Sequence, residues 1–179
     1  TYNWGSTGRI AEEISQIVIR AGGKSYLAYG RYYNEGKSIP IRIGNSIEIY
    51  FHVLQSRLFD KHGLASKNAT LKLIKQIELI QPSIIHLHNI HGYYLNFPIL
   101  FRYLSSAGIP VVWTLHDCWP FTGHCAHFDF INCNKWKTQC HNCEALKAYP
   151  KTFFDSSSKN YLLKKQYLTQ IPNMILVPV

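Results

Sequence analysis

Acidic residues are scarce in this sequence of 179 residues, and their scarcity sets its charge. Ten Asp and Glu stand against 19 Lys and Arg, which leaves a net charge of +9. A soluble protein with lysines on solvated faces accounts for this balance, and so does attraction to phosphates in a nucleotide, a nucleic acid or a membrane surface. Because the basic residues are dispersed along the chain, composition alone does not choose among these partners.

Long apolar runs are missing as well. The longest, such as 109–113 and 174–179, fall far short of the roughly 18 residues that a membrane-spanning helix needs. No basic stretch followed by an apolar one opens the sequence, so we expect no signal peptide and a cytoplasmic location. Charged residues make up only 16% and hydrophobic residues 46%, a balance that excludes a disordered chain and allows one domain with a buried core.

Helical and strand patterns alternate along the chain. Apolar residues recur at helical spacing over 10–18, 46–59, 70–80, 95–107 and 157–169. Short apolar runs of strand length lie at 25–29, 41–43, 83–87, 110–115 and 174–177. Such alternation with short connections predicts an α/β fold, a Rossmann-like three-layer domain whose parallel sheet has helices on both faces.

Polar side chains follow two of the predicted strands. His88 and His91 come after one strand, and His116 and Asp117 come after another. Ligands of parallel sheets bind just past the carboxyl ends of the strands, so we expect these residues to meet at one edge. In a strand, His86 and His88 point to the same face, which permits a metal pair. The favoured interpretation is that His88 or His91 forms a hydrogen bond to a polar substrate.

A glycine-rich segment, Gly5-Ser6-Thr7-Gly8, opens the first helical pattern. Glycines let the backbone approach a ligand closely, and the free N–H groups of a helix N-terminus favour negative charge. The segment is therefore a candidate anion cradle at the same edge of the sheet, although an ordinary glycine-rich turn has the same pattern.

Cysteines mark a segment, from 118 to about 150, that has no helical or strand periodicity. Cys125, Cys133, Cys140 and Cys143 have the spacing C-x7-C-x6-C-x2-C, and the C-x-x-C half is typical of tetrahedral zinc. A structural zinc would also order the loop, with His124, His127 or His141 as substitute ligands. Two disulfides and four free thiols are the alternatives. An odd fifth cysteine, Cys118, and the lack of an export signal argue against disulfides.

The stretch from Trp113 to Cys125 reads WTLHDCWPFTGHC and resembles a known family. It is similar to the amino-terminal domain of retaining family 4 glycosyltransferases of the GT-B fold, of the kind that act in colanic acid and surface-polysaccharide biosynthesis. Supporting matches are GSTGRI at 5–10, HLHNIHGYYLN at 86–96, the cysteine-rich segment, and the final LVPV. The resemblance covers essentially the whole sequence.

This resemblance implies the acceptor-binding half of an enzyme that moves a sugar from a nucleotide-sugar to a glycan or lipid-linked acceptor. A strand ahead of Gly5 and a carboxy-terminal nucleotide-sugar domain belong to that fold but not to this sequence, so we expect residues 1–179 alone to be inactive. The resemblance implies no catalytic metal, and it implies a front-face attack in which the leaving phosphate takes the acceptor proton. By analogy the catalytic residues are His88, His91, His116 and Asp117, and the substrate-binding residues are Gly5, Ser6, Thr7, Gly8, Arg9, Asn89 and Trp119.

Two other functions stay open at this stage. One is a zinc-stapled, non-enzymatic module that binds nucleic acid or another polyanion, and the other is a metallohydrolase built on His86, His88, His116 and Asp117. The α/β alternation and the dispersed basic residues favour the transferase, without a nucleic-acid partner. The positive charge and a lipid-linked acceptor are also compatible with peripheral contact to an anionic membrane on its inner face.

Overall fold

The computed structural model describes every residue from Thr1 to Val179. Its helices are α1 (Gly5–Arg20), α2 (Ser46–Phe59), α3 (Lys67–Ile80), α4 (Phe97–Ser106) and α5 (Ser157–Leu168). Its strands are β1 (Tyr26–Tyr29), β2 (Ile39–Arg42), β3 (Ile85–Leu87), β4 (Val111–Leu115) and β5 (Met174–Pro178). Three short 3-10 helices lie between β4 and α5: η1 (Trp119–Phe121), η2 (Asp129–Ile131) and η3 (Lys135–Lys137). No helix is both long enough and apolar enough to cross a membrane.

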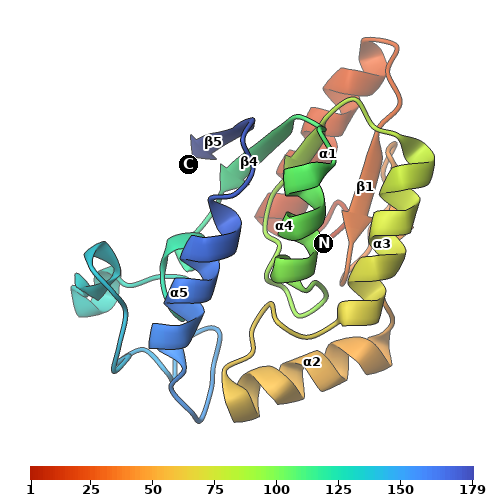
Figure 1. Ribbon diagram of the computed structural model, residues 1–179. Helices are drawn as coiled ribbons and strands as arrows, with labels where there is room; N and C mark the ends of the chain where they lie inside the picture. Colours follow the sequence, from red (N-terminus) through yellow and green to blue (C-terminus); the bar gives the residue numbers. More distant parts are fainter.

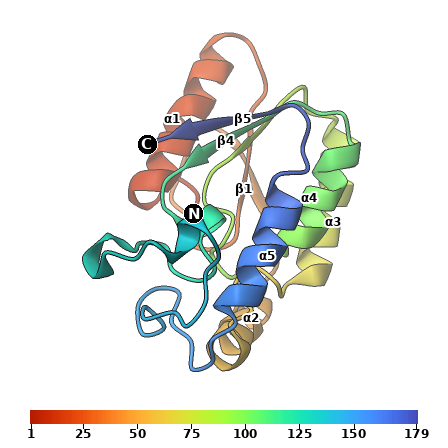
Figure 2. The same ribbon diagram turned by 60° about the vertical axis from the view of Figure 1, so that its left-hand side comes forward.

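All strand pairs are parallel, and they form two sheets. β1 pairs with β2, whereas β3, β4 and β5 form a second sheet in that order. The strands lie between α1 on one side and α3, α4 and α5 on the other, as Figure 2 shows. The predicted three-layer α/β arrangement is therefore confirmed, but the single predicted sheet is divided.

Side-chain caps mark the starts of α2 and α4 but not those of α1, α3 and α5. α4 begins two residues later than its periodicity indicates, because the side chain of Asn96 accepts a hydrogen bond from the Ile99 N–H at 3.1 Å. α1 begins at Gly5, so the glycine-rich segment is the first turn of the helix and not a loop before it. No side chain caps that turn.

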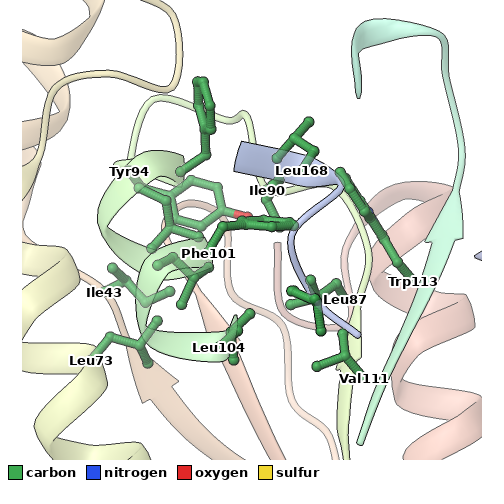
Figure 3. Close-up of a cluster of buried hydrophobic side chains, with 14 of the residues drawn as sticks. Ile43, Leu73, Leu87, Ile90, Tyr94, Phe101, Leu104, Val111, Trp113 and Leu168 are labelled. Atoms are coloured by element: carbon green, nitrogen blue, oxygen red, sulfur yellow. The ribbon is translucent and has the colours of Figure 1, made fainter. Parts of the chain in front are cut away.

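The hydrophobic core lies where β3 and β4 pack against α3, α4 and α5. Eighteen buried side chains form one cluster. Figure 3 shows Trp113 and Val111 of β4 near Leu87 of β3, with Phe101 and Leu104 of α4 packed against them. This core fixes the carboxyl ends of β3 and β4 relative to each other.

A buried polar network holds the cysteine-rich segment on the domain. The Asp60 carboxylate, just after α2, lies 2.7 Å from the His124 ring nitrogen, and both side chains are almost fully buried. From α5, the Lys164 ammonium donates to the backbone carbonyls of Trp119 at 2.8 Å and Thr122 at 3.1 Å. These contacts connect the first part of the irregular region between β4 and α5 to helices.

Candidate functional site

The polar residues that follow β3 and β4 form two hydrogen-bonded pairs. His88 Nδ1 lies 2.9 Å from His116 Nε2, and His91 Nε2 lies 2.7 Å from Asp117 Oδ2. The pairs form because β3 and β4 are adjacent and parallel, with Leu87 opposite Trp113, so the residues after each strand leave the sheet side by side. The predicted meeting of these two segments is confirmed.

His86 and His88 share one face of β3, as strand alternation predicts. Their rings stack with centroids 4.3 Å apart, and His86 Nε2 lies 2.8 Å from the Thr114 hydroxyl. No group of three or more His, Cys, Asp and Glu side chains is arranged to hold a metal ion anywhere in the structure. The geometry thus gives no support to a metallohydrolase built on these histidines.

A cavity of about 670 Å³ brings the glycine-rich turn to the same site. Residues of β1 and β3 line it, and most of its lining residues are hydrophobic. Its polar lining comes from the first turn of α1 and from the loop after β3, and includes Gly5, Ser6, Thr7, His88, Asn89 and His91. The remaining predicted residues, Gly8, Arg9, His116, Asp117 and Trp119, do not line it. His116 and Asp117 reach the cavity only through the histidines that they contact.

The Asp117 carboxylate fixes the orientation and tautomer of His91. Burial raises the pKa of Asp117, but the hydrogen bond and charge of His91 and the Trp119 N–H outweigh burial and hold this pKa below its usual value. Asp117 is therefore an acceptor only, and His91 Nε2 must carry the hydrogen between them. In the neutral form of His91 its Nδ1 keeps a lone pair, and the Tyr149 hydroxyl lies 3.4 Å from it. The side chain can accept a hydrogen bond from a hydroxyl at the cavity.

His88 offers a neutral imidazole to the cavity. Burial, together with the neighbouring His86 and His116, lowers the pKa of His88 to about 4. Its Nδ1 is occupied by His116, while its Nε2 makes no hydrogen bond within the protein. At neutral pH the side chain can hydrogen-bond a polar ligand, but it brings no positive charge.

Two further residues of the site were missed from the sequence. Arg31 lines the cavity directly after β1, with its guanidinium 5.4 Å from the Tyr93 ring centroid. His88 was identified because it lies just past the carboxyl end of a strand. The same reasoning points to Arg31, because Arg31 follows β1. Tyr149 comes from the cysteine-rich segment, and burial raises the pKa of its phenol. No local pattern marks Tyr149 as a site residue.

Trp119 supports the site from the interior. Its side chain is only 1% exposed, and its ring lies 5.0 Å from that of His91. The Lys164 ammonium sits 3.8 Å from the centroid of the same indole. Trp119 thus packs beneath His91 and does not line the cavity, although the family resemblance implied a substrate-binding role for it.

The five cysteines are all free thiols. A hydrogen bond between the Cys125 and Cys143 side chains lowers the pKa of Cys125 and, with burial, raises that of Cys143. Cys140 Sγ accepts the Gly123 N–H at 3.2 Å. Cys133 and Cys140 also act on the pKa of Cys125, so the four thiols predicted to bind zinc lie near one another, although they are not arranged as a metal-binding group. Zinc stays a prediction for metal analysis.

The fold and the site define an α/β protein with a polar site at the carboxyl ends of parallel strands. Among proteins of known description, the chain is similar to WcaC of Escherichia coli (strain K12), named as a proposed glycosyl transferase of colanic acid biosynthesis. The two are 26% identical over 181 residues, which covers 93% of this chain and 43% of WcaC. The chain therefore spans less than half the length of that relative. No family model and no solved structure matches it.

Proposed function

We propose that this chain is the acceptor-binding half of a retaining glycosyltransferase of the GT-B type. In this proposal the whole enzyme moves a sugar from a nucleotide-sugar to a glycan or lipid-linked acceptor. The supporting observation is the joint presence of His88, His91 and the first turn of α1 on one cavity. The similarity to WcaC over nearly the whole chain agrees with it.

The anionic part of the donor has a complementary partner at this cavity. The first turn of α1, at Gly5, Ser6 and Thr7, has no side-chain cap, so its N–H groups are available to a phosphate. Arg31 lines the same cavity and adds a guanidinium suited to phosphate oxygens. These groups fit the diphosphate of a nucleotide-sugar.

The two histidines have the chemistry to orient a sugar. The neutral ring of His91 can accept a hydrogen bond at Nδ1 from a sugar hydroxyl that replaces the Tyr149 hydroxyl, and His88 Nε2 is free to pair with a second sugar hydroxyl. Neither side chain needs to remove a proton, because in front-face transfer with retention the leaving phosphate takes the acceptor proton. Their contribution is to hold the sugar in the reactive orientation.

An activity assay of the full gene product, the whole protein that contains this chain, tests the proposal. Nucleotide-sugars are screened for release of the nucleoside diphosphate with and without glycan or lipid-linked acceptors, and NMR gives the anomeric configuration of the product. We expect acceptor-dependent release and a product with the configuration of the donor. Failure to release diphosphate from any donor, or a product of inverted configuration, would contradict the proposal.

A further inference from the structure

Two large aromatic side chains stay exposed beside the glycine-rich turn. Trp4 directly precedes Gly5 and is 52% exposed, and Tyr32, after β1, is 57% exposed. Their rings stack, with centroids 5.9 Å apart and planes 22° apart, and both side chains line the cavity. Trp and Tyr normally bury most of their ring surface in a folded chain. Because these two rings are exposed and line the cavity, they offer a flat surface to a ligand at its opening.

Arg31 connects this pair to the loop that carries the site histidines. Its guanidinium lies 5.5 Å from the Tyr32 ring centroid and 5.4 Å from the Tyr93 ring centroid. Tyr93 follows His91 by two residues, and it is only 8% exposed. The contacts thus run from the interior of the site through Arg31 and Tyr32 to Trp4. Trp4 is the last ring of this series, because Tyr32 is its only aromatic neighbour.

Backbone contacts hold the two rings in place. The Tyr2 N–H donates to the Tyr32 carbonyl at 2.9 Å, and the Asn34 N–H donates to the Tyr2 carbonyl at 3.0 Å. These bonds pair the first residues of the chain with the segment after β1, and in Figure 1 the N-terminus lies beside the arrowhead of β1. Tyr32 and Tyr93 both have a left-handed backbone, with φ of 52° and 64°, which is rare for aromatic residues. Such strained backbone is concentrated at ligand-binding sites, where the surrounding structure maintains it.

The groups around Trp4 suit a sugar ring better than a nucleobase. Thr1, Ser6 and Thr7 line the same cavity, and each hydroxyl can both donate and accept a hydrogen bond, as a sugar hydroxyl does. A pyranose ring packs its C–H groups on an aromatic face and leaves its hydroxyls at the edge for such partners. Recognition of a nucleobase by its edge commonly uses carboxylate and amide side chains. No Asp or Glu lines the cavity, and its single amide, Asn89, belongs to the loop after β3.

The position of the pair points to the acceptor. In the proposed function the diphosphate lies at the first turn of α1 and at Arg31. In front-face transfer the acceptor approaches on the side of the leaving phosphate, so an acceptor ring belongs beside the groups that hold this phosphate. Trp4 directly precedes that turn of α1, and Tyr32 contacts Arg31.

We propose that Trp4 and Tyr32 form a stacking subsite for one pyranose ring of a glycan acceptor. Trp4 supplies the free ring face, Tyr32 supports the indole, and Arg31 supports Tyr32. This assignment rests on the proposed transferase function, and it specifies the acceptor as one that presents a sugar ring to this chain.

Steady-state kinetics of the full gene product test the proposal. Trp4→Ala should raise the KM for a water-soluble glycan acceptor by about tenfold, because the acceptor loses its stacking contact. The KM for the nucleotide-sugar should change much less. Trp4→Phe, which keeps a ring face, should restore most of the acceptor affinity. Tyr50→Ala on α2 is the matched control, because this aromatic is 66% exposed and does not line the cavity.

Two kinetic results would overturn the proposal. If Trp4→Ala raises the KM for the nucleotide-sugar and leaves the KM for the acceptor unchanged, the indole stacks on the nucleobase of the donor. If Trp4→Ala and Tyr50→Ala have the same acceptor KM, the pair takes no part in acceptor binding. The melting temperature of each variant, measured beside that of the parent protein, separates a loss of binding from a loss of folding.

A binding measurement without turnover separates this proposal from the transferase function. An array of bacterial oligosaccharides is probed with the full gene product, and we expect glycan binding that Trp4→Ala loses and Trp4→Phe keeps. Absence of glycan binding that depends on Trp4 would overturn the subsite. If such binding is found but no donor releases its diphosphate, the subsite stands and the transferase function fails. If acceptor-dependent release occurs with an acceptor KM that Trp4→Ala does not change, the transferase function stands and the subsite fails.

Discussion

At the residue scale, the pair formed by His91 and Asp117 is the part of the site with the best-defined chemistry. The carboxylate accepts from His91 Nε2 at 2.7 Å and from the Trp119 N–H at 3.0 Å, so it fixes both the ring and its tautomer. Asp117 does not line the cavity, which makes it a positioning residue for His91.

Asp117→Asn should lower the activity of the full gene product and change its pH profile. The amide can donate to His91 Nε2, which favours the other tautomer and removes the lone pair at Nδ1. A hydrogen bond to a charged group is worth about 1.5–3 kcal/mol, so we expect kcat to fall by about tenfold to a hundredfold. The control is Asp129→Asn at an exposed site. An unchanged kcat with an unchanged pH profile would show that the pair has no role in turnover.

Acid should destabilise the folded chain below about pH 6.5. Burial lowers the pKa of His52 to about 4, and burial with neighbouring histidines lowers that of His88 to about 4. Between these values and the ordinary pKa of 6.5, the unfolded chain binds more protons than the folded chain, so stability falls as pH falls through this window. Urea unfolding from pH 7 to pH 4 measures the change. His52→Gln should flatten the dependence, whereas His141→Gln, at an exposed site, should not; equal slopes would contradict the assignment.

The buried Lys164 predicts a second pH dependence, on the alkaline side. Burial lowers the pKa of Lys164 to about 7, whereas the unfolded lysine titrates near 10.5. Above pH 7 the unfolded state therefore holds the extra proton, and this lysine's contribution to stability rises with pH. Compared with Lys164→Met, the parent chain should gain stability by at most about 1.4 kcal/mol per pH unit between pH 7 and 10. Lys165→Met, the exposed neighbour, is the control, and parallel curves for the parent and Lys164→Met would refute the prediction.

The placement of side chains was predictable where it depends on strand alternation or on the end of a strand. His86 and His88 stack on one face because successive strand residues alternate, and that pattern is local. The burial of Trp119 was not predictable, since it depends on Lys164, 45 residues later, whose ammonium donates to the Trp119 carbonyl. Tyr149 reaches the cavity for the same reason: long-range contacts place it there.

At the element scale, apolar periodicity located each helix and strand to within a few residues. The cysteine-rich segment is the exception, because its position depends on contacts such as that between His124 and Asp60, 64 residues apart. The exposed apolar face of α2 also escaped prediction. Its spacing indicates a buried stripe, but the tertiary structure buries His52 and Ser56 instead.

The capping box of α2 is a local feature whose effect can be measured. The Asn45 side chain accepts the Glu48 N–H at 3.0 Å, and the Glu48 side chain accepts the Asn45 N–H at 3.0 Å. Asn45→Ala should lower the free energy of unfolding by about 1 kcal/mol, because it leaves an N–H of the first turn without its partner. Thermal and urea unfolding measure the loss. Asn45→Asp, which keeps the acceptor, should restore most of it; an Asn45→Ala variant as stable as the parent would contradict the role of the cap.

At the scale of the whole molecule, parallel pairing made the meeting of the site segments predictable. β3 and β4 end side by side, so the histidines that follow β3 meet His116 and Asp117. The division of the strands into two sheets and the cavity between β1 and β3 were not predictable, because they depend on how the two sheets lie relative to each other.

The most direct test is the turnover of the full gene product with His88→Ala and His91→Ala, each measured with a nucleotide-sugar and a water-soluble acceptor. His141→Ala, at an exposed site on the cysteine-rich segment, is the matched control. If these two histidines hold the sugar, at least one substitution should lower kcat by about a hundredfold or more while the melting temperature stays near that of the control. Full activity in both variants would contradict a sugar-binding role for this cavity.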